Sequence, residues 1–111
     1  MHCIEMLPEG SERLCSSIIN WYLMEYLSDF SIDLTVEHMD LSGEGVTGWC
    51  MKTGEQEFHI QIHNELEGDE YTSTILHELY HVYQHLTNQP QCEMCAYKAE
   101  KELLDEFRKP C

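Results

Sequence analysis

Apolar residues first recur along the chain with the period of a helix and then in short runs typical of strands. Helical spacing after Ser11 predicts a helix over residues 11–29, with Ser11 as its N-terminal cap. Three short apolar runs, strictly alternating in the first and the last, then predict strands. These strands cover residues 32–36, 46–51 and 58–62. A turn at residues 52–55 separates the last two, so we expect them to pair as a hairpin.

The second half of the chain follows a helical period. Four apolar residues at spacings i, i+4, i+7 and i+11 predict a helix with one side in the core. They are Ile75, Leu79, Val82 and Leu86. A Thr/Ser cluster at 72–74 offers the N-cap, and residues 88–90 end this helix before a final one over 91–108. We therefore expect one α+β domain over residues 1–111, with an N-terminal helix, a three-stranded sheet and two C-terminal helices.

The first of these C-terminal helices carries two histidines four residues apart, His77 and His81, with Glu78 directly after the first. This HExxH pattern is typical of zinc-dependent hydrolases. Four helical residues advance about 6 Å and about 40° past a full turn, so both imidazoles can bind one ion. Glu78 lies beside them, where it can hold a water and accept its proton. The histidines fall opposite the apolar stripe, which predicts that they face a cleft.

The net charge of the chain limits the kinds of molecule that it is expected to bind. Six lysines and arginines against 21 acidic residues give a net charge of −15, which disfavours binding to nucleic acids and to anionic membranes. No apolar run is long enough for a transmembrane helix, and the first ten residues lack the pattern of a secretory signal. We expect a cytoplasmic protein whose partner is a peptide or protein substrate. The acidity fits solubility or a bias toward basic peptides, and the sequence leaves the oligomeric state open.

The six cysteines are expected to be reduced thiols, because the chain has enough periodic structure to form its own core. Cys92 and Cys95 form a CxxC pair that matches half of a structural zinc site, but no second pair has a standard spacing. We therefore expect no second metal site there. A structural zinc protein that uses this pair, with an accidental HExxH, remains an alternative.

Other histidines are expected to lie outside the ligand set. His59 and His63 share one face of the third strand with Gln61, and we interpret them as a solvated or cleft-facing row. The α-carbon of His85 lies about 12 Å from that of His77 along a helix, too far to share one ion. We expect His85 at the rim of the cleft.

A catalytic zinc needs a third protein ligand, and the final helix offers two. On a helical wheel, Glu93 and Glu100 fall on the apolar side of this helix, where a carboxylate needs a partner such as a metal. A tight helix hairpin centred on Pro90 favours Glu100. If the motif helix ends near His85, Glu93 is level with the histidines instead.

The order HExxH, a short break and then Glu93-Met-Cys-Ala-Tyr97 resembles the gluzincin group of zinc metallopeptidases. The likeness is greatest to the minimal members called minigluzincins and to similar small phage-encoded proteins. It covers residues 72–107 closely and the preceding segments in outline. The resemblance implies a zincin-like fold and a third ligand glutamate followed by alanine at +3. In this sequence that pattern assigns Glu93, which we rank above Glu100.

We therefore expect a zinc metallopeptidase with one Zn²⁺ per chain and Glu78 as general base. The substrate would lie along the third strand if that strand is the sheet edge beside the cleft. Glu100 could orient a histidine that binds the metal. Three further residues are of a type that can donate to the oxyanion, namely Tyr97, Tyr80 and His63. The alternative is a catalytically silent or latent zincin-fold module that binds or regulates without cleaving peptides.

Overall fold

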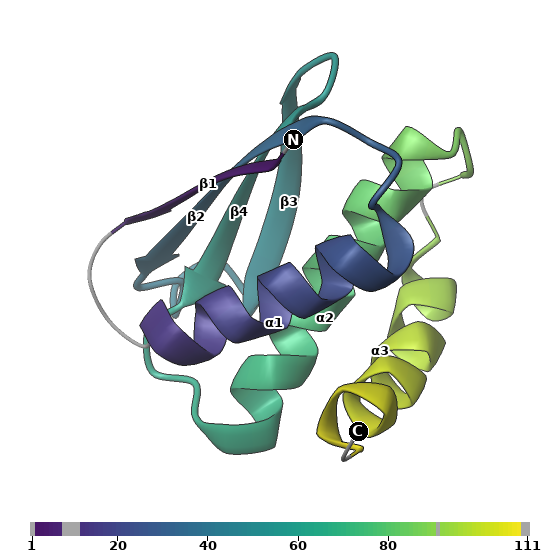
Figure 1. Cartoon of the computed structure of the whole chain (residues 1–111). Helices are drawn as coiled ribbons and strands as arrows, with labels where there is room; N and C mark the ends of the chain where they lie inside the picture. The colour runs from purple at the N-terminus through teal and green to yellow at the C-terminus, as the bar shows by residue number, and fades with distance from the viewer. Residues whose placement is uncertain (1, 8–11, 91, 110–111) are drawn as a thin grey trace.

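The computed structural model describes residues 2–7, 12–90 and 92–109, with side chains described from residue 14 onward. Seven elements follow one another along the chain (Figure 1). They are β1 (His2–Leu7), α1 (Glu12–Tyr26), β2 (Ile32–Met39), β3 (Gly48–Gly54), β4 (Glu57–His63), α2 (Gly68–Leu86) and α3 (Glu93–Arg108). All three expected helices are present, and α1 ends at Tyr26, before the expected residue 29. Ser11, the expected cap of α1, lies outside the described residues.

The sheet is mixed, with strand order β1-β2-β4-β3. The expected hairpin is present, because β3 pairs antiparallel with β4, while β2 pairs parallel with β4 on its other side. β1 pairs parallel with β2 and adds a fourth strand to the three that the sequence indicated. β4 therefore lies inside the sheet, and β1 and β3 are the edges of the described sheet. This corrects the expectation that the strand over 58–62 could border the cleft as an edge.

Helices α1 and α2 cover one face of the sheet, and α3 lies against α2 on the side away from the sheet (Figure 1). Alternation in β2 and β4 turns every second side chain toward these helices, which is why both strands show the expected period of two. The buried residues that meet there include Ile18, Leu23, Leu34, Val36, Ile60, Ile62, Ile75 and Leu79. None of the helices in the described ranges is long and apolar enough to cross a membrane.

Helix α2 begins earlier than the sequence suggested. Its N-cap is Glu67, without a side-chain capping bond, and Gly68 has a positive φ of 58°. Asp69 and Glu70 occupy the first turn, where negative charge interacts favourably with the helix dipole. The expectation that the Thr/Ser cluster at 72–74 caps this helix is therefore wrong. Those side chains lie inside the helix, where the hydroxyl of Thr72 donates to the carbonyl of Gly68.

The connection between α2 and α3 decides how the two helices align. α2 ends at Leu86, and the chain reverses through Asn88, whose φ of 58° is left-handed. Gln89 N–H donates to the carbonyl of Gln84 at 2.8 Å, closing the turn before α3 begins at Glu93. Because α2 ends within one residue of His85, the first turn of α3 comes level with the HExxH histidines.

Candidate metal centre

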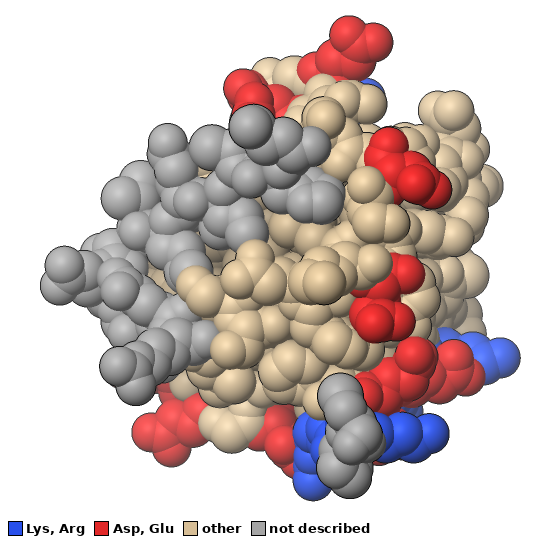
Figure 2. All heavy atoms as spheres, in the orientation of Figure 1, with Lys and Arg blue, Asp and Glu red and all other residues tan. Residues whose placement is uncertain are grey.

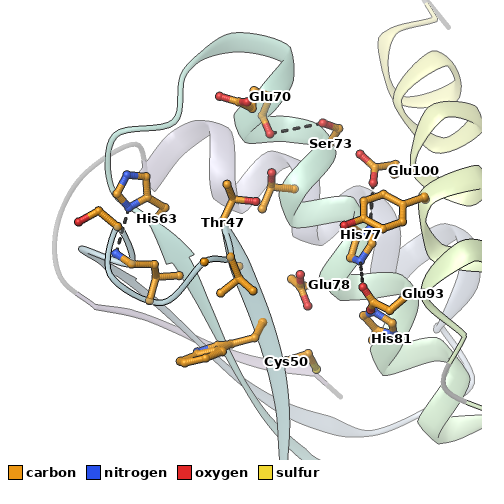
Figure 3. Close-up of a pocket in the computed structure, with 18 residues that line it drawn as sticks. Thr47, Cys50, His63, Glu70, Ser73, His77, Glu78, His81, Glu93 and Glu100 are labelled. Carbon is orange, nitrogen blue, oxygen red and sulfur yellow. Dashed lines mark hydrogen bonds and ion pairs between the residues drawn. The ribbon is translucent and has the colours of Figure 1, made fainter.

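A cleft of about 930 Å³ lies between β3 and the loop before it on one side and α2 and α3 on the other (Figure 3). The approach of β3 to α2 depends on Gly48. A Cβ at this position would lie 3.0 Å from the Cγ2 of Thr74 on α2. Glycine therefore lets the edge strand pass close beside the helix that carries the HExxH motif.

Three side chains from α2 and α3 converge in this cleft. The Nε2 of His81 lies 2.5 Å from Glu93 Oε1, and the Nε2 of His77 lies 3.5 Å from Glu93 Oε2. One donor atom from each of these three residues lies within 4.8 Å of the others. Within the described part of the chain, this is the one group of three or more such residues that could hold a metal ion. Of the two carboxylates left open by the sequence, the structure brings Glu93 to both Nε2 atoms.

The other ring nitrogens of the two histidines are occupied by fixed acceptors. His77 Nδ1 donates to Glu100 Oε1 at 2.9 Å, and His81 Nδ1 donates to Gln84 Oε1 at 2.8 Å. Gln84 is buried, and its Nε2 donates in turn to the carbonyl of Cys92 at 3.5 Å, which fixes its oxygen toward His81. A proton on each Nδ1 leaves each Nε2 with a lone pair.

Two Nε2 atoms can face one carboxylate when a proton or a metal cation lies between nitrogen and oxygen, because a bare lone pair would repel the carboxylate. Neutral imidazoles with oriented Nδ1–H groups and a nearby carboxylate form a donor set that suits Zn²⁺ and similar borderline metal ions. The residues present therefore fit the metal that the HExxH pattern implies. Glu100 accepts from His77 Nδ1 whereas Glu93 faces Nε2 of the same ring, so the Glu100 carboxylate is placed to orient this imidazole and does not meet both Nε2 atoms.

Glu78 lines the same cleft and is 4% exposed. Figure 3 shows its carboxylate between the two histidines of α2 and the side of the cleft formed by β3. Burial, together with the charges of Glu93 and Glu100, raises the pKa of Glu78 to about 8. A carboxylate so placed can accept a proton from a water held in the cleft.

The three residues expected as possible oxyanion donors differ in their position relative to the cleft. The ring of Tyr97 packs against His77 with centroids 4.7 Å apart, and its side chain borders the cleft from α3. His63 lines the opposite side of the cleft, where its Nδ1 accepts the backbone N–H of Leu41 at 3.0 Å. Tyr80 is not among the residues that line the cleft, and its ring lies against Tyr83. Of these three candidates, Tyr97 and His63 therefore border the cleft and Tyr80 does not.

His59 and His85 are not part of the group formed by His77, His81 and Glu93. His59 Nε2 is 3.1 Å from Glu37 Oε1, and Gln61 donates to the same oxygen at 2.9 Å. The indole of Trp49 donates to Gln61, so this row forms a polar network on the sheet face away from the helices. His85, expected at the cleft rim, packs against Phe58 and does not line the cleft.

The charges around the cleft favour a cation. Four glutamates line it, Glu70, Glu78, Glu93 and Glu100, and no lysine or arginine whose side chain the structure describes does so. Most basic side chains visible in Figure 2 gather at one end of the molecule, near the end of α3. Four of the six basic residues of the chain lie in the last 14 positions, namely Lys98, Lys101, Arg108 and Lys109.

No family model, characterised protein or solved structure is similar enough to this chain to match it.

Sequence reasoning missed Gln84 and the contribution of β3. Gln84 follows His81 by three residues on one helix, a spacing that places the two side chains together and could have identified it. Cys50 and Gly48 of β3 line the cleft opposite the histidines. No local pattern marks them, because their role depends on which strand lies at the sheet edge.

Proposed function

We propose that this protein is a zinc-dependent peptidase of the HExxH gluzincin type, with zinc bound by His77, His81 and Glu93. The observation that carries the proposal is the pairing of the ring nitrogens. Both Nδ1 atoms bind fixed acceptors, and both Nε2 atoms face the carboxylate of Glu93. That arrangement is the one a metal with two imidazole ligands and one carboxylate ligand requires.

A bound zinc ion would lower the pKa of a water molecule and polarise a peptide carbonyl. The chain itself supplies the base: Glu78 is close to both histidines and faces the cleft, so it can take the proton of that water and pass it to the leaving amine. Tyr97, whose ring packs on His77, is our preferred donor to the developing oxyanion. His63 is the second candidate, since with its Nδ1 accepting from Leu41 a neutral ring carries its proton on Nε2.

An extended peptide could bind along β3. This strand is at the edge of the sheet, pairs only with β4 among the described strands, and lines the cleft through Gly48, Trp49 and Cys50. Unpaired backbone groups at a sheet edge accept an added strand, and alternate side chains of that strand would then point toward α2 and α3. The four cleft glutamates favour substrates with basic side chains near the scissile bond.

The test is peptide turnover in the zinc-loaded protein and in Glu78→Gln, which keeps the size of the side chain and removes the base. We expect activity to fall by roughly 10²–10⁴-fold while zinc affinity is retained. Glu70→Gln is the matched control for removing one cleft carboxylate, because Glu70 lies outside the ligand group; it should keep the zinc affinity and lose far less activity than Glu78→Gln. Loss of zinc in Glu78→Gln would mean that Glu78 is a ligand. Tight zinc binding without turnover of a diverse peptide library would favour the silent binding module instead.

A further inference from the structure

Cys92 and Cys95 lie at the start of α3, on either side of the ligand Glu93. Cys92 is the N-cap of α3, and its Sγ accepts the backbone N–H of Cys95 at 3.2 Å. Both cysteines are free, Cys92 is half-buried and Cys95 is exposed. Two thiols thus lie in one helical turn, at a surface that small reagents can reach.

The backbone already holds this pair near the geometry of a disulfide. Side chains three residues apart on a helix have Cβ atoms about 5–6 Å apart, and a disulfide needs about 3.5–4.5 Å. Rotation of the Cys92 side chain away from the N–H of Cys95, with a small adjustment of the first turn, makes up the difference. Cys15, by contrast, is fully buried and Cys50 is partly buried, and desolvation raises their pKa to about 11 and about 12.

The same turn is linked to the metal ligands by two routes. Glu93 is covalently between the two cysteines, so its carboxylate moves with the first turn of α3. The carbonyl of Cys92 accepts from Gln84, whose oxygen accepts from His81 Nδ1. A change in the backbone at Cys92 therefore moves Glu93 directly and affects His81 through the side chain of Gln84.

We propose that Cys92 and Cys95 form a reversible disulfide by exchange with a low-molecular-weight disulfide, and that this bond weakens metal binding by His77, His81 and Glu93. One protein sulfur loses its proton, bonds to a sulfur of the small disulfide and releases one small thiol. The second protein sulfur then attacks the mixed disulfide and releases the other. The protein loses two electrons and two protons, and the small disulfide is reduced to two thiols.

Metal binding weakens because oxidation withdraws the Cys92 sulfur from the N–H of Cys95, so α3 loses its cap beside Glu93. The coupling rests on the proposed zinc site, whereas formation of the disulfide does not. Linkage requires the converse effect as well, so that zinc binding favours the dithiol over the disulfide by the same factor.

The disulfide is tested in the metal-free protein equilibrated in glutathione redox buffers, with alkylation and mass spectrometry. Cleavage by trypsin after Lys52 and Lys98 gives a peptide, residues 53–98, in which Cys92 and Cys95 are the only cysteines. We expect this peptide to become two hydrogens lighter and resistant to alkylation as oxidised glutathione increases. The Cys95→Ser variant should instead retain glutathione on Cys92. A peptide that stays fully alkylatable in excess oxidised glutathione overturns the proposal.

The coupling is tested by calorimetric titration of Zn²⁺ into the reduced and oxidised protein. We expect the oxidised form to bind roughly tenfold more weakly. The glutathione midpoint of the pair should shift toward easier reduction with zinc, by about 30 mV for a tenfold effect. In Glu93→Gln the disulfide should still form and the shift should vanish.

Equal zinc affinity of the two forms overturns the coupling. A shift that persists in Glu93→Gln also overturns it, because zinc would then be bound by the thiols themselves. If the reduced wild-type protein binds no zinc, the zinc site and the coupling fail together, while the disulfide is judged separately by the metal-free experiment.

Discussion

Two carboxylates of α3 approach the same imidazole from different sides. Glu100 accepts from His77 Nδ1, whereas Glu93 faces His77 Nε2 and His81 Nε2. The residues are seven apart, about two helical turns, so they share one side of α3 and differ in position along its axis by about 10 Å. The helical wheel could place both on the ligand side but could not rank them.

We predict that Glu93→Ala lowers zinc affinity far more than Glu100→Ala. Removing Glu93 takes away a ligand, whereas removing Glu100 frees a ligand histidine to rotate, which typically costs 10–100-fold. Calorimetric titration of both variants measures the difference. A larger loss in Glu100→Ala would show that Glu100 binds the metal directly and that the assignment of Glu93 is wrong.

At the scale of elements, β3 and α2 form opposite sides of the cleft and pass close to each other beside it. Residues of α2 are buried on several sides, against the sheet, α1 and α3, which is why His77 and His81 are 7% exposed although they lie off the apolar stripe. Gly48 sets the distance between β3 and this helix, with its backbone against Thr74 and Ile62.

We predict that Gly48→Ala lowers the free energy of unfolding by about 1–3 kcal/mol, the usual cost of inserting a methyl group into a packed contact. The new Cβ would lie 3.0 Å from Thr74 Cγ2 and 3.2 Å from the carbonyl oxygen of Gln61, so β3 or α2 must shift. Urea denaturation measures the change.

Gly43→Ala is the control, because a Cβ there meets nothing within 4 Å. It should alter the free energy of unfolding by less than about 0.5 kcal/mol. Equal effects of the two variants would mean that contact between β3 and α2 is not what Gly48 provides.

For the molecule as a whole, stability should depend on pH through the core that joins α1 to α2. Cys15 is fully buried, and burial raises its pKa from 9.0 to about 11, partly offset by its hydrogen bond with Tyr71. In the unfolded chain this thiol loses its proton near pH 9, but in the folded protein only near pH 11. The stability it contributes is therefore complete below pH 9 and is lost as the pH rises toward 11.

We predict that the free energy of unfolding of the wild type falls more steeply between pH 9 and 11 than that of Cys15→Ala. The difference should reach at most about 3 kcal/mol, the value of two pKa units. Chemical denaturation at several pH values measures both proteins, and other titrating groups cancel in the comparison. Parallel curves would show that Cys15 titrates in the folded protein as it does in the unfolded chain.

The sequence by itself determined the three helices, the two strands of the hairpin and the strand before them. It also determined that His77 and His81 lie on the same side of one helix. These features depend on periodicity over a few residues, which the backbone geometry of a helix or strand fixes locally. The end of the motif helix soon after His85 could also be predicted, because Asn88 and Pro90 disfavour a continuing helix.

Only the tertiary structure decided the order of the strands, the addition of β1, and which of Glu93 and Glu100 lies beside both Nε2 atoms. It also turned Tyr80 away from the cleft and placed Gln84 between His81 and Cys92. These outcomes depend on how segments far apart in the chain pack, and on where a turn ends one helix relative to the next. A local pattern predicts which face of each element is buried, but not how far along α2 the first turn of α3 lies. That offset decides which carboxylate meets the two Nε2 atoms.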